Sequence, residues 1–231
     1  MIEFGKLEYY LLVVNAIGAL AYLINLLLYR HTANGQIDVI VTIVSLLGGS
    51  AGMLLMILLF DRKAEKENMM SRVFIICIFI IQVIMLLIFK GHHAEHFTFA
   101  FWKFFAEHRI LLIYLGIMNL VTFIVFAIDK TNARANRSRI RIVTLLGLSF
   151  AGGSVGGLIS MYLFRHKTQK DYFTVGMPLI IVMQVVVLFY LMNAGGGSVV
   201  VVIGYFLQRV LLDPYIIDLL STFALIKSWI F

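Results

Sequence analysis

Six long apolar stretches dominate the pattern of hydrophobic and polar positions. Each holds roughly 17 to 23 residues without Asp, Glu, Lys or Arg, and they run from Tyr10 to Leu28, Val39 to Phe60, Val73 to Phe89, Leu111 to Ile128, Ile142 to Phe164 and Val175 to Met192. A helix rises about 1.5 Å per residue, so these lengths match a hydrocarbon core about 30 Å thick. The apolarity is continuous, not alternating, which favours helices over a barrel. We therefore predict an all-α, multi-pass helical bundle in the cell membrane.

Composition supports the membrane assignment and excludes other classes. Hydrophobic residues make up 61% of the 231 positions and charged residues 13%, with a mean hydropathy of +0.97. A soluble domain carries about twice that charged fraction. The net charge of +7 comes from basic residues in short loops, which bias topology and contact anionic lipid headgroups, so no nucleic-acid partner is expected. Cys77 is alone, so there is no disulfide framework, and no cofactor is expected.

The sequence falls onto itself when it is shifted by 104 positions. Tyr10 then meets Tyr114, Asn15 meets Asn119, and the GGSxG run that begins at Gly48 meets the one that begins at Gly152. We therefore predict two copies of a three-helix unit, within residues 1–89 and 110–192. Residues 90–109 form an aromatic, histidine-bearing linker, and residues 193–231 an apolar tail that is either an interfacial helix or a seventh span.

Three spans per unit is an odd number, so consecutive units should enter the membrane from opposite sides. This predicts inverted-topology repeats related by a two-fold axis in the membrane plane. The first loop of the first unit has only Arg30, whereas its counterpart has five basic residues between Lys130 and Arg141. The positive-inside bias then places the Lys130–Arg141 loop, and with it the N-terminus, in the cytoplasm.

Small and amide residues inside the apolar stretches are the first candidates for a site. Glycines spaced as GxxxG let helices approach closely, which predicts that the second and fifth helices cross there. The alternative is that the adjacent glycines interrupt those helices at mid-membrane and expose backbone to a substrate, although no proline supports a break. Amides in hydrocarbon need partners, so they should join helices or line a shared central site. These candidates are Gly48, Gly49, Gly152, Gly153, Asn15 and Asn119.

Charged residues at helix ends are the second group of candidates. They are either snorkelling anchors or a basic face for an anionic headgroup or substrate: Asp129, Lys130, Arg139, His166 and Lys167. Under inverted topology Asp129 and His166 lie on opposite faces, so they should not form one site. His92, His93 and His96 are the weak metal candidates, since two of them share a helix face, but a solvated loop is the default interpretation.

The second unit carries a spaced pattern of polar, glycine and aromatic residues: Asn119, Phe123, Asp129–Lys130, Ala133, Arg139–Ile140, Gly152–Gly153, Gly156, Arg165–His166–Lys167–Thr168 and Phe173. This pattern resembles a bacterial membrane family, domain of unknown function 1294. The family pattern continues Arg-Ile with Pro-Glu, where this chain has Arg141–Ile142, so any role of that glutamate is lost. The resemblance implies a small inner-membrane protein and no established activity. The first unit departs further, with Asn25–Leu26 in place of Asp–Lys.

Three functions compete. The first is a small transporter or channel with a site at the interface of the inverted repeats. The second is an accessory or structural subunit that binds lipid, a partner protein or another copy of itself, which the lack of charge within the spans favours. The third is an enzyme, because Arg165–His166 followed by Tyr172 resembles a segment of isoprenylcysteine-type methyltransferases. Lys167 stands where those enzymes have proline, and the expected topology separates His166 from the cytoplasm, so an enzyme is the less favoured hypothesis.

Overall fold

A computed structural model describes residues 5–31, 38–61, 68–89, 91 and 97–193, and its described part is helical. Six segments are long and apolar enough to cross a membrane: Lys6–Leu28, Val39–Phe60, Met69–Phe89, Arg109–Arg134, Ile142–Leu163 and Asp171–Asn193. The prediction of an all-α, multi-pass membrane protein is confirmed. The tail from 194 onwards and His92, His93 and His96 lie outside the described residues.

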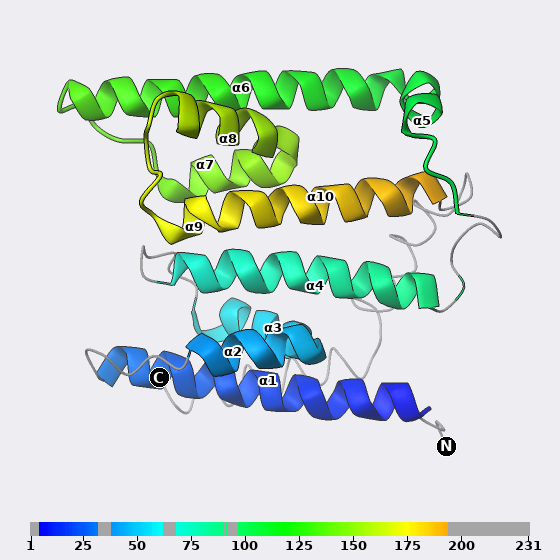
Figure 1. Ribbon diagram of the computed structural model, residues 1–231. Helices are drawn as coiled ribbons and strands as arrows, with labels where there is room; N and C mark the ends of the chain where they lie inside the picture. The colour runs from blue at the N-terminus through cyan, green and yellow to red at the C-terminus, as the bar shows by residue number, and fades with distance from the viewer. Residues whose placement is uncertain (1–4, 32–37, 62–67, 90, 92–96, 194–231) are drawn as a thin grey trace.

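The helices form two groups, which Figure 1 shows one above the other. Unit one comprises α1 (Lys6–His31), α2 (Asp38–Val44), the short break η1 (Ser45–Gly49), α3 (Ser50–Phe60) and α4 (Met69–Phe89). After α5 (Phe101–Glu107), unit two comprises α6 (Arg109–Arg134), α7 (Ile142–Leu148), the break η2 (Ser149–Gly153), α8 (Ser154–Leu163), α9 (Asp171–Thr174) and α10 (Gly176–Asn193).

The second apolar segment of each unit folds back on itself. Its central glycine has a positive φ, +116° at Gly48 and +112° at Gly152, where the helix is interrupted. The two arms have 7 and 11 residues in unit one, and 7 and 10 in unit two. At about 1.5 Å per residue each arm covers roughly a third to a half of the hydrocarbon core. Each segment is therefore a re-entrant helical hairpin, which we call hairpin one (α2–η1–α3) and hairpin two (α7–η2–α8).

Hydrogen bonds fix the direction of the hairpins. In unit two, Asp129 near the end of α6 bonds both Ile140, just before α7, and His166, just after α8. Both ends of hairpin two therefore lie at one end of α6, as Figure 1 shows. Bonds between α6 and hairpin two keep a constant separation of 37 positions, at Tyr114–Ala151 and Asn119–Gly156, so α8 runs parallel to α6 and α7 runs back.

The expected inverted topology is therefore wrong, and so is the placement of Asp129 and His166 on opposite faces. With its hairpin each unit has two helices that run the full length of the bundle, an even number, and both units begin and end at the same end of the bundle (Figure 1). Hydropathy could not reveal this, because a folded-back segment of 22 apolar residues has the length and composition of a span.

The two units meet along α4 and α10, which lie side by side at the centre and run in the same direction (Figure 1). Val73 and Cys77 of α4 share a buried apolar cluster with Met177 and Ile180 of α10. Towards the other end Ile84 packs with Tyr190. The contact between the units is thus mainly hydrophobic. Hairpins one and two lie on its outer sides, each between the central helix and the outer helix of its own unit.

Candidate functional site

The tips of the two hairpins carry closely similar sets of side-chain bonds. In unit two, the Tyr114 hydroxyl donates to the Ala151 carbonyl at 2.7 Å, Asn119 donates to the Gly152 carbonyl at 2.9 Å, and Gln184 donates to the Ser149 carbonyl at 2.7 Å. The Ser154 hydroxyl donates to Gln184 in return. These bonds satisfy backbone carbonyls that the break leaves without helical partners in hydrocarbon.

Unit one repeats the bonds of the tyrosine, the glutamine and the serine. Tyr10 donates to the Leu47 carbonyl at 2.7 Å, Gln82 donates to the Ser45 carbonyl at 2.7 Å, and the Ser50 hydroxyl donates to Gln82. The Gly52 amide donates to Asn15 at 2.8 Å, as the Gly156 amide does to Asn119 at 2.7 Å. Asn15 and Asn119 thus each bond the hairpin of their own unit and do not line one shared central site.

The glycines have two separate roles. Gly48 and Gly152 supply the positive φ of the breaks, as the alternative of interrupted helices proposed. Gly52 and Gly156 allow close approach, because an added Cβ would lie 2.0 Å from the carbonyl oxygen of Asn15 or Asn119. The partner at this approach is the outer helix of the same unit. The expectation that the second and fifth helices cross each other at their glycines is therefore wrong.

A buried ionic group lies at the opposite end of hairpin two. Asp129 is fully buried, and its Oδ1 accepts the Ile140 amide at 2.8 Å. Its Oδ2 lies 2.9 Å from His166 Nε2 and 2.6 Å from Lys167 Nζ. The Lys167 ammonium also lies 5.0 Å from the centre of the Phe173 ring, within cation–π range. One carboxylate thus joins the start of hairpin two, its end and the outer helix.

The backbone of this turn is strained. α8 ends with the His166 amide bonded to the Met161 carbonyl and the Arg165 amide bonded to the Tyr162 carbonyl. Arg165 has φ +45° and Lys167 φ +63°, in a region that helix ends usually reserve for glycine. A side chain there costs roughly 1–2 kcal/mol per residue. The turn keeps Arg165 and Lys167 despite this cost, and such strain clusters at functional sites.

Positive charge surrounds the buried carboxylate. Burial lowers the pKa of the Lys167 ammonium below its ordinary value, Asp129 acts in the opposite direction, and the charge of Arg139 lowers it further. Arg139, Arg141 and Arg165 are exposed around the ionic group. Among the residues that the structure describes, none of these three forms an ion pair with an acid. We call this end of unit two, residues 129–141 and 165–170, the basic end.

Unit one has a different ionic group at the corresponding place. Asn25 stands at the position of Asp129, and the buried carboxylate is Asp61, directly after α3. Asp61 accepts the Tyr22 hydroxyl at 2.8 Å and pairs with Arg72 of α4 at 2.9 Å. The buried carboxylate thus lies at the end of the hairpin in unit one, not on the outer helix as in unit two, and a cation of the central helix neutralises it.

The structure brings only part of the predicted set together. Asp129, His166 and Lys167 form one group, Arg139 lies beside it, and half-buried Lys130 lies at the same end. In the described ranges no cluster of three His, Cys, Asp or Glu residues could hold a metal. Sequence reasoning missed Gln82 and Gln184, because they are 102 positions apart and a shift of 104 does not align them.

Comparisons with known proteins bear on the same region. Residues 119–173 match the family described as "Protein of unknown function (DUF1294)". The chain is also 36% identical over 74 residues to a Bacillus subtilis (strain 168) protein named "Uncharacterized protein YsdA"; the matched part is 32% of this chain and 83% of that protein. The chain belongs to the DUF1294 family. No solved structure matches it.

The DUF1294 match covers the candidate site of unit two. It begins at Asn119, which bonds the hairpin tip, and ends at Phe173, over which Lys167 lies. It includes hairpin two and the whole ionic group, but not the first part of α6 or any of α10. The Bacillus subtilis protein has room for one such unit but not for two, since 74 residues make up 83% of it.

Proposed function

We propose that this DUF1294 protein binds a phosphate-bearing anion, the headgroup of an anionic lipid, at the basic end of unit two. The observation that carries the proposal is the position of Asp129, which neutralises Lys167 and orders the segments on both sides of hairpin two. Arg139, Arg141 and Arg165 are exposed at those segments and keep their charges for a ligand. Arginine suits this ligand because its fork of donors matches phosphate oxygens.

The distribution of charge supports a cytoplasmic location for the basic end. At the end of the bundle where hairpins one and two begin, the cations with described side chains are Arg72, Lys130, Arg134, Arg137, Arg139, Arg141, Arg165, Lys167 and Lys170. At the other end they are Lys6, Lys103 and Arg109. The positive-inside bias then places the basic end in the cytoplasm, beside the anionic leaflet. The N-terminus lies outside on this proposal, in place of the cytoplasmic position expected from six crossings.

Lipid binding by the purified protein tests the proposal. Native mass spectrometry should record phosphatidylglycerol retained in preference to phosphatidylcholine. The double variant Arg139→Gln/Arg165→Gln should retain phosphatidylglycerol about thirtyfold more weakly, since each basic residue near an anionic surface contributes about 1 kcal/mol. The matched control is Lys6→Gln/Lys103→Gln, which removes the same charge from the opposite end and should leave retention unchanged.

Competition with inorganic phosphate identifies the source of the anion. Retention that phosphate does not displace assigns a lipid headgroup, whereas displacement assigns a soluble phosphate compound. Equal retention of phosphatidylglycerol by the basic-end variant and its control would overturn the proposal.

A second candidate is transport, favoured by the break that each hairpin makes at mid-membrane. Non-helical backbone at this depth lines substrate paths in many transporters. A path would run within a unit, because apolar side chains fill the contact between α4 and α10. The bonds that Tyr114, Asn119 and Gln184 make to the tip would have to open. Anion flux into proteoliposomes that Gly152→Ala abolishes would support this function, and absence of flux above empty vesicles would exclude it.

A further inference from the structure

Each hairpin lies between the outer and central helices of its unit and extends along only about half of their length. A crevice remains beyond its tip, along the other half of these helices. In unit two it has a volume of about 550 Å³ and lies between the first half of α6 and the second half of α10. Its floor is the hairpin tip, with Asn119, Gly152 and Gln184, and its walls include Leu111, Leu115, Val187 and Leu191. We call it the unit-two crevice.

The polar atoms of the floor already have partners. Both functional ends of Asn119 are bonded, its amide to the Leu115 and Gly152 carbonyls and its oxygen to the Gly156 amide. Gln184 donates to two backbone carbonyls and accepts from Ser154. The floor therefore offers no unsatisfied donor or acceptor from these two amides, and an occupant gains nothing from a polar group at its inner end. The crevice suits plain hydrocarbon.

Unit one has the same crevice, but it is smaller, about 290 Å³. The walls explain part of the difference. Leu47, Phe79, Met85 and Phe89 of unit one correspond to Ala151, Ile181, Val187 and Leu191 of unit two, so four positions have smaller side chains in unit two. Two positions change in the opposite direction, from Leu46 to Phe150 and from Ala51 to Val155. The net result is more room above the hairpin tip in unit two.

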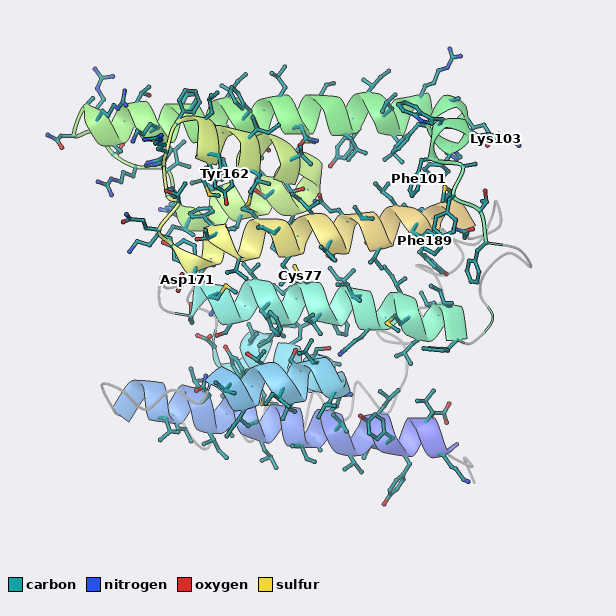
Figure 2. All side chains as sticks on the ribbon, in the orientation of Figure 1. Cys77, Phe101, Lys103, Tyr162, Asp171 and Phe189 are labelled. Atoms are coloured by element: carbon teal, nitrogen blue, oxygen red, sulfur yellow. The ribbon has the colours of Figure 1, made fainter. Side chains whose placement is uncertain are left out.

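The linker closes the end of this unit. Thr98 and Asn193 exchange two hydrogen bonds, with the Thr98 amide 2.6 Å from the Asn193 oxygen. Phe97 and Phe99 pack on Phe189 of α10 with ring centres 5.9 and 5.3 Å apart. Figure 2 shows Phe101, Lys103 and Phe189 together at this end, opposite to Asp171. The linker thus contacts the end of α10, whereas the residues that line the crevice all belong to the membrane-spanning segments.

We infer that the unit-two crevice holds one hydrocarbon chain of a membrane lipid. The site lies in the half of the bilayer away from the basic end and does not depend on the anion proposed above. The occupant follows from three features together: the apolar walls, the floor whose two amides are already satisfied, and a position within the membrane-spanning helices. A chain displaced from the bilayer loses none of its apolar surroundings there, and it fills a space that packing otherwise leaves empty.

Photolabelling of the full chain in phosphatidylcholine vesicles tests this inference. The probe is phosphatidylcholine with a photoreactive group in one acyl chain, and labelled peptides are mapped by mass spectrometry. In the unchanged protein, label should appear on Leu115 and Val187. The variant Ala151→Leu/Val187→Met gives the crevice the residues of unit one, and the label on Leu115 should fall roughly tenfold, as two or more methylenes lose their place.

The controls keep the result interpretable. Val182→Met adds the same side-chain volume as Val187→Met, but on the exposed face of α10, and it should leave the label on Leu115 unchanged. Val187→Met alone should give an intermediate loss, which covers the case in which the double variant fails to fold. Label on Val182 but none on Leu115 in the unchanged protein would overturn the inference, because the crevice would then be closed to lipid. So would a label that the double variant leaves undiminished.

Discussion

Units one and two share the centre of the membrane and differ at the membrane surface. At the hairpin tips an equivalent tyrosine, asparagine and glutamine bond equivalent backbone groups, and an equivalent serine donates to that glutamine. At the other end the carboxylate sits on the outer helix in unit two and after the hairpin in unit one. The tip bonds are what any re-entrant hairpin in lipid requires, so both units keep them. The ionic groups are free to diverge, and there we expect function to reside.

The largest expected effect concerns topology. It decides whether the two units have the same orientation in the membrane, as the comparison requires. In a Cys77→Ser background, single cysteines at Ser138 and Gln169 should react with a membrane-impermeant reagent from the same side. A cysteine at Trp102, which is 89% exposed, should react only from the opposite side. Reaction of positions 138 and 169 from opposite sides would restore three crossings per unit and invalidate the hairpins.

The next effect should be equally large in both units. Gly52→Ala and Gly156→Ala each place a Cβ 2.0 Å from a backbone oxygen, so each should lower the free energy of unfolding by about 3 kcal/mol or prevent folding. Gly116→Ala and Gly147→Ala are the matched controls, since nothing lies within 4 Å of their added Cβ atoms. Thermal unfolding in detergent measures the difference. A loss in one unit only would show that the hairpins are not equivalent.

Asp129→Asn should show that the two units depend on different ionic groups at their surface ends. Asparagine is the residue that unit one has at this position, but in unit two it leaves Lys167 without its counter-charge. Removing one partner of a buried pair costs about 3 kcal/mol, which should appear as a lower melting temperature in detergent. Asp171→Asn, an exposed carboxylate at the same end, is the control and should change little. Equal melting temperatures for the two variants would mean that the ionic group does not hold hairpin two.

The smallest effect belongs to unit one. Tyr22→Phe removes a donor to the buried carboxylate of Asp61 and should lower the free energy of unfolding by about 1 kcal/mol. Unit two has Phe126 at this place and needs no hydroxyl, because its carboxylate lies elsewhere. The control is Tyr9→Phe in the same helix, 65% exposed, which should be neutral in the same unfolding experiment. A neutral Tyr22→Phe would leave Arg72 and Asn68 as the partners that hold Asp61.

Sequence alone located the apolar helices and the equivalent positions of the two units. Asn15 and Asn119 do stand at equivalent places, and the adjacent glycines do mark an interruption of the helix. The sequence could not show whether an apolar segment spans the membrane or folds back, because a hairpin of two half-length helices has the same hydropathy as one span. The assumption of a crossing at each apolar stretch then separated Asp129 from His166, although they lie 2.9 Å apart.

The glutamines that hold the hairpin tips were missed for a second reason. The loop between hairpin and central helix is two residues shorter in unit two, so Gln82 and Gln184 do not align when the chain is shifted by 104. A single amide within an apolar helix is then indistinguishable from any other polar residue that has found a partner. Spatial pairing with Ser50 and Ser154, which the alignment of short motifs cannot supply, identifies them.

An even number of crossings per unit means that adding a unit does not change the orientation of the unit that follows it. A copy joined end to end inherits the orientation of the first, and its arginines and lysines arrive on the face where they already belong. A module with an odd number of crossings must first exist in both orientations, or redistribute its charges, before two copies can be fused. The hairpin bend at a single glycine thus allows two such units to stand in one chain with the same orientation and with their basic residues on the same face.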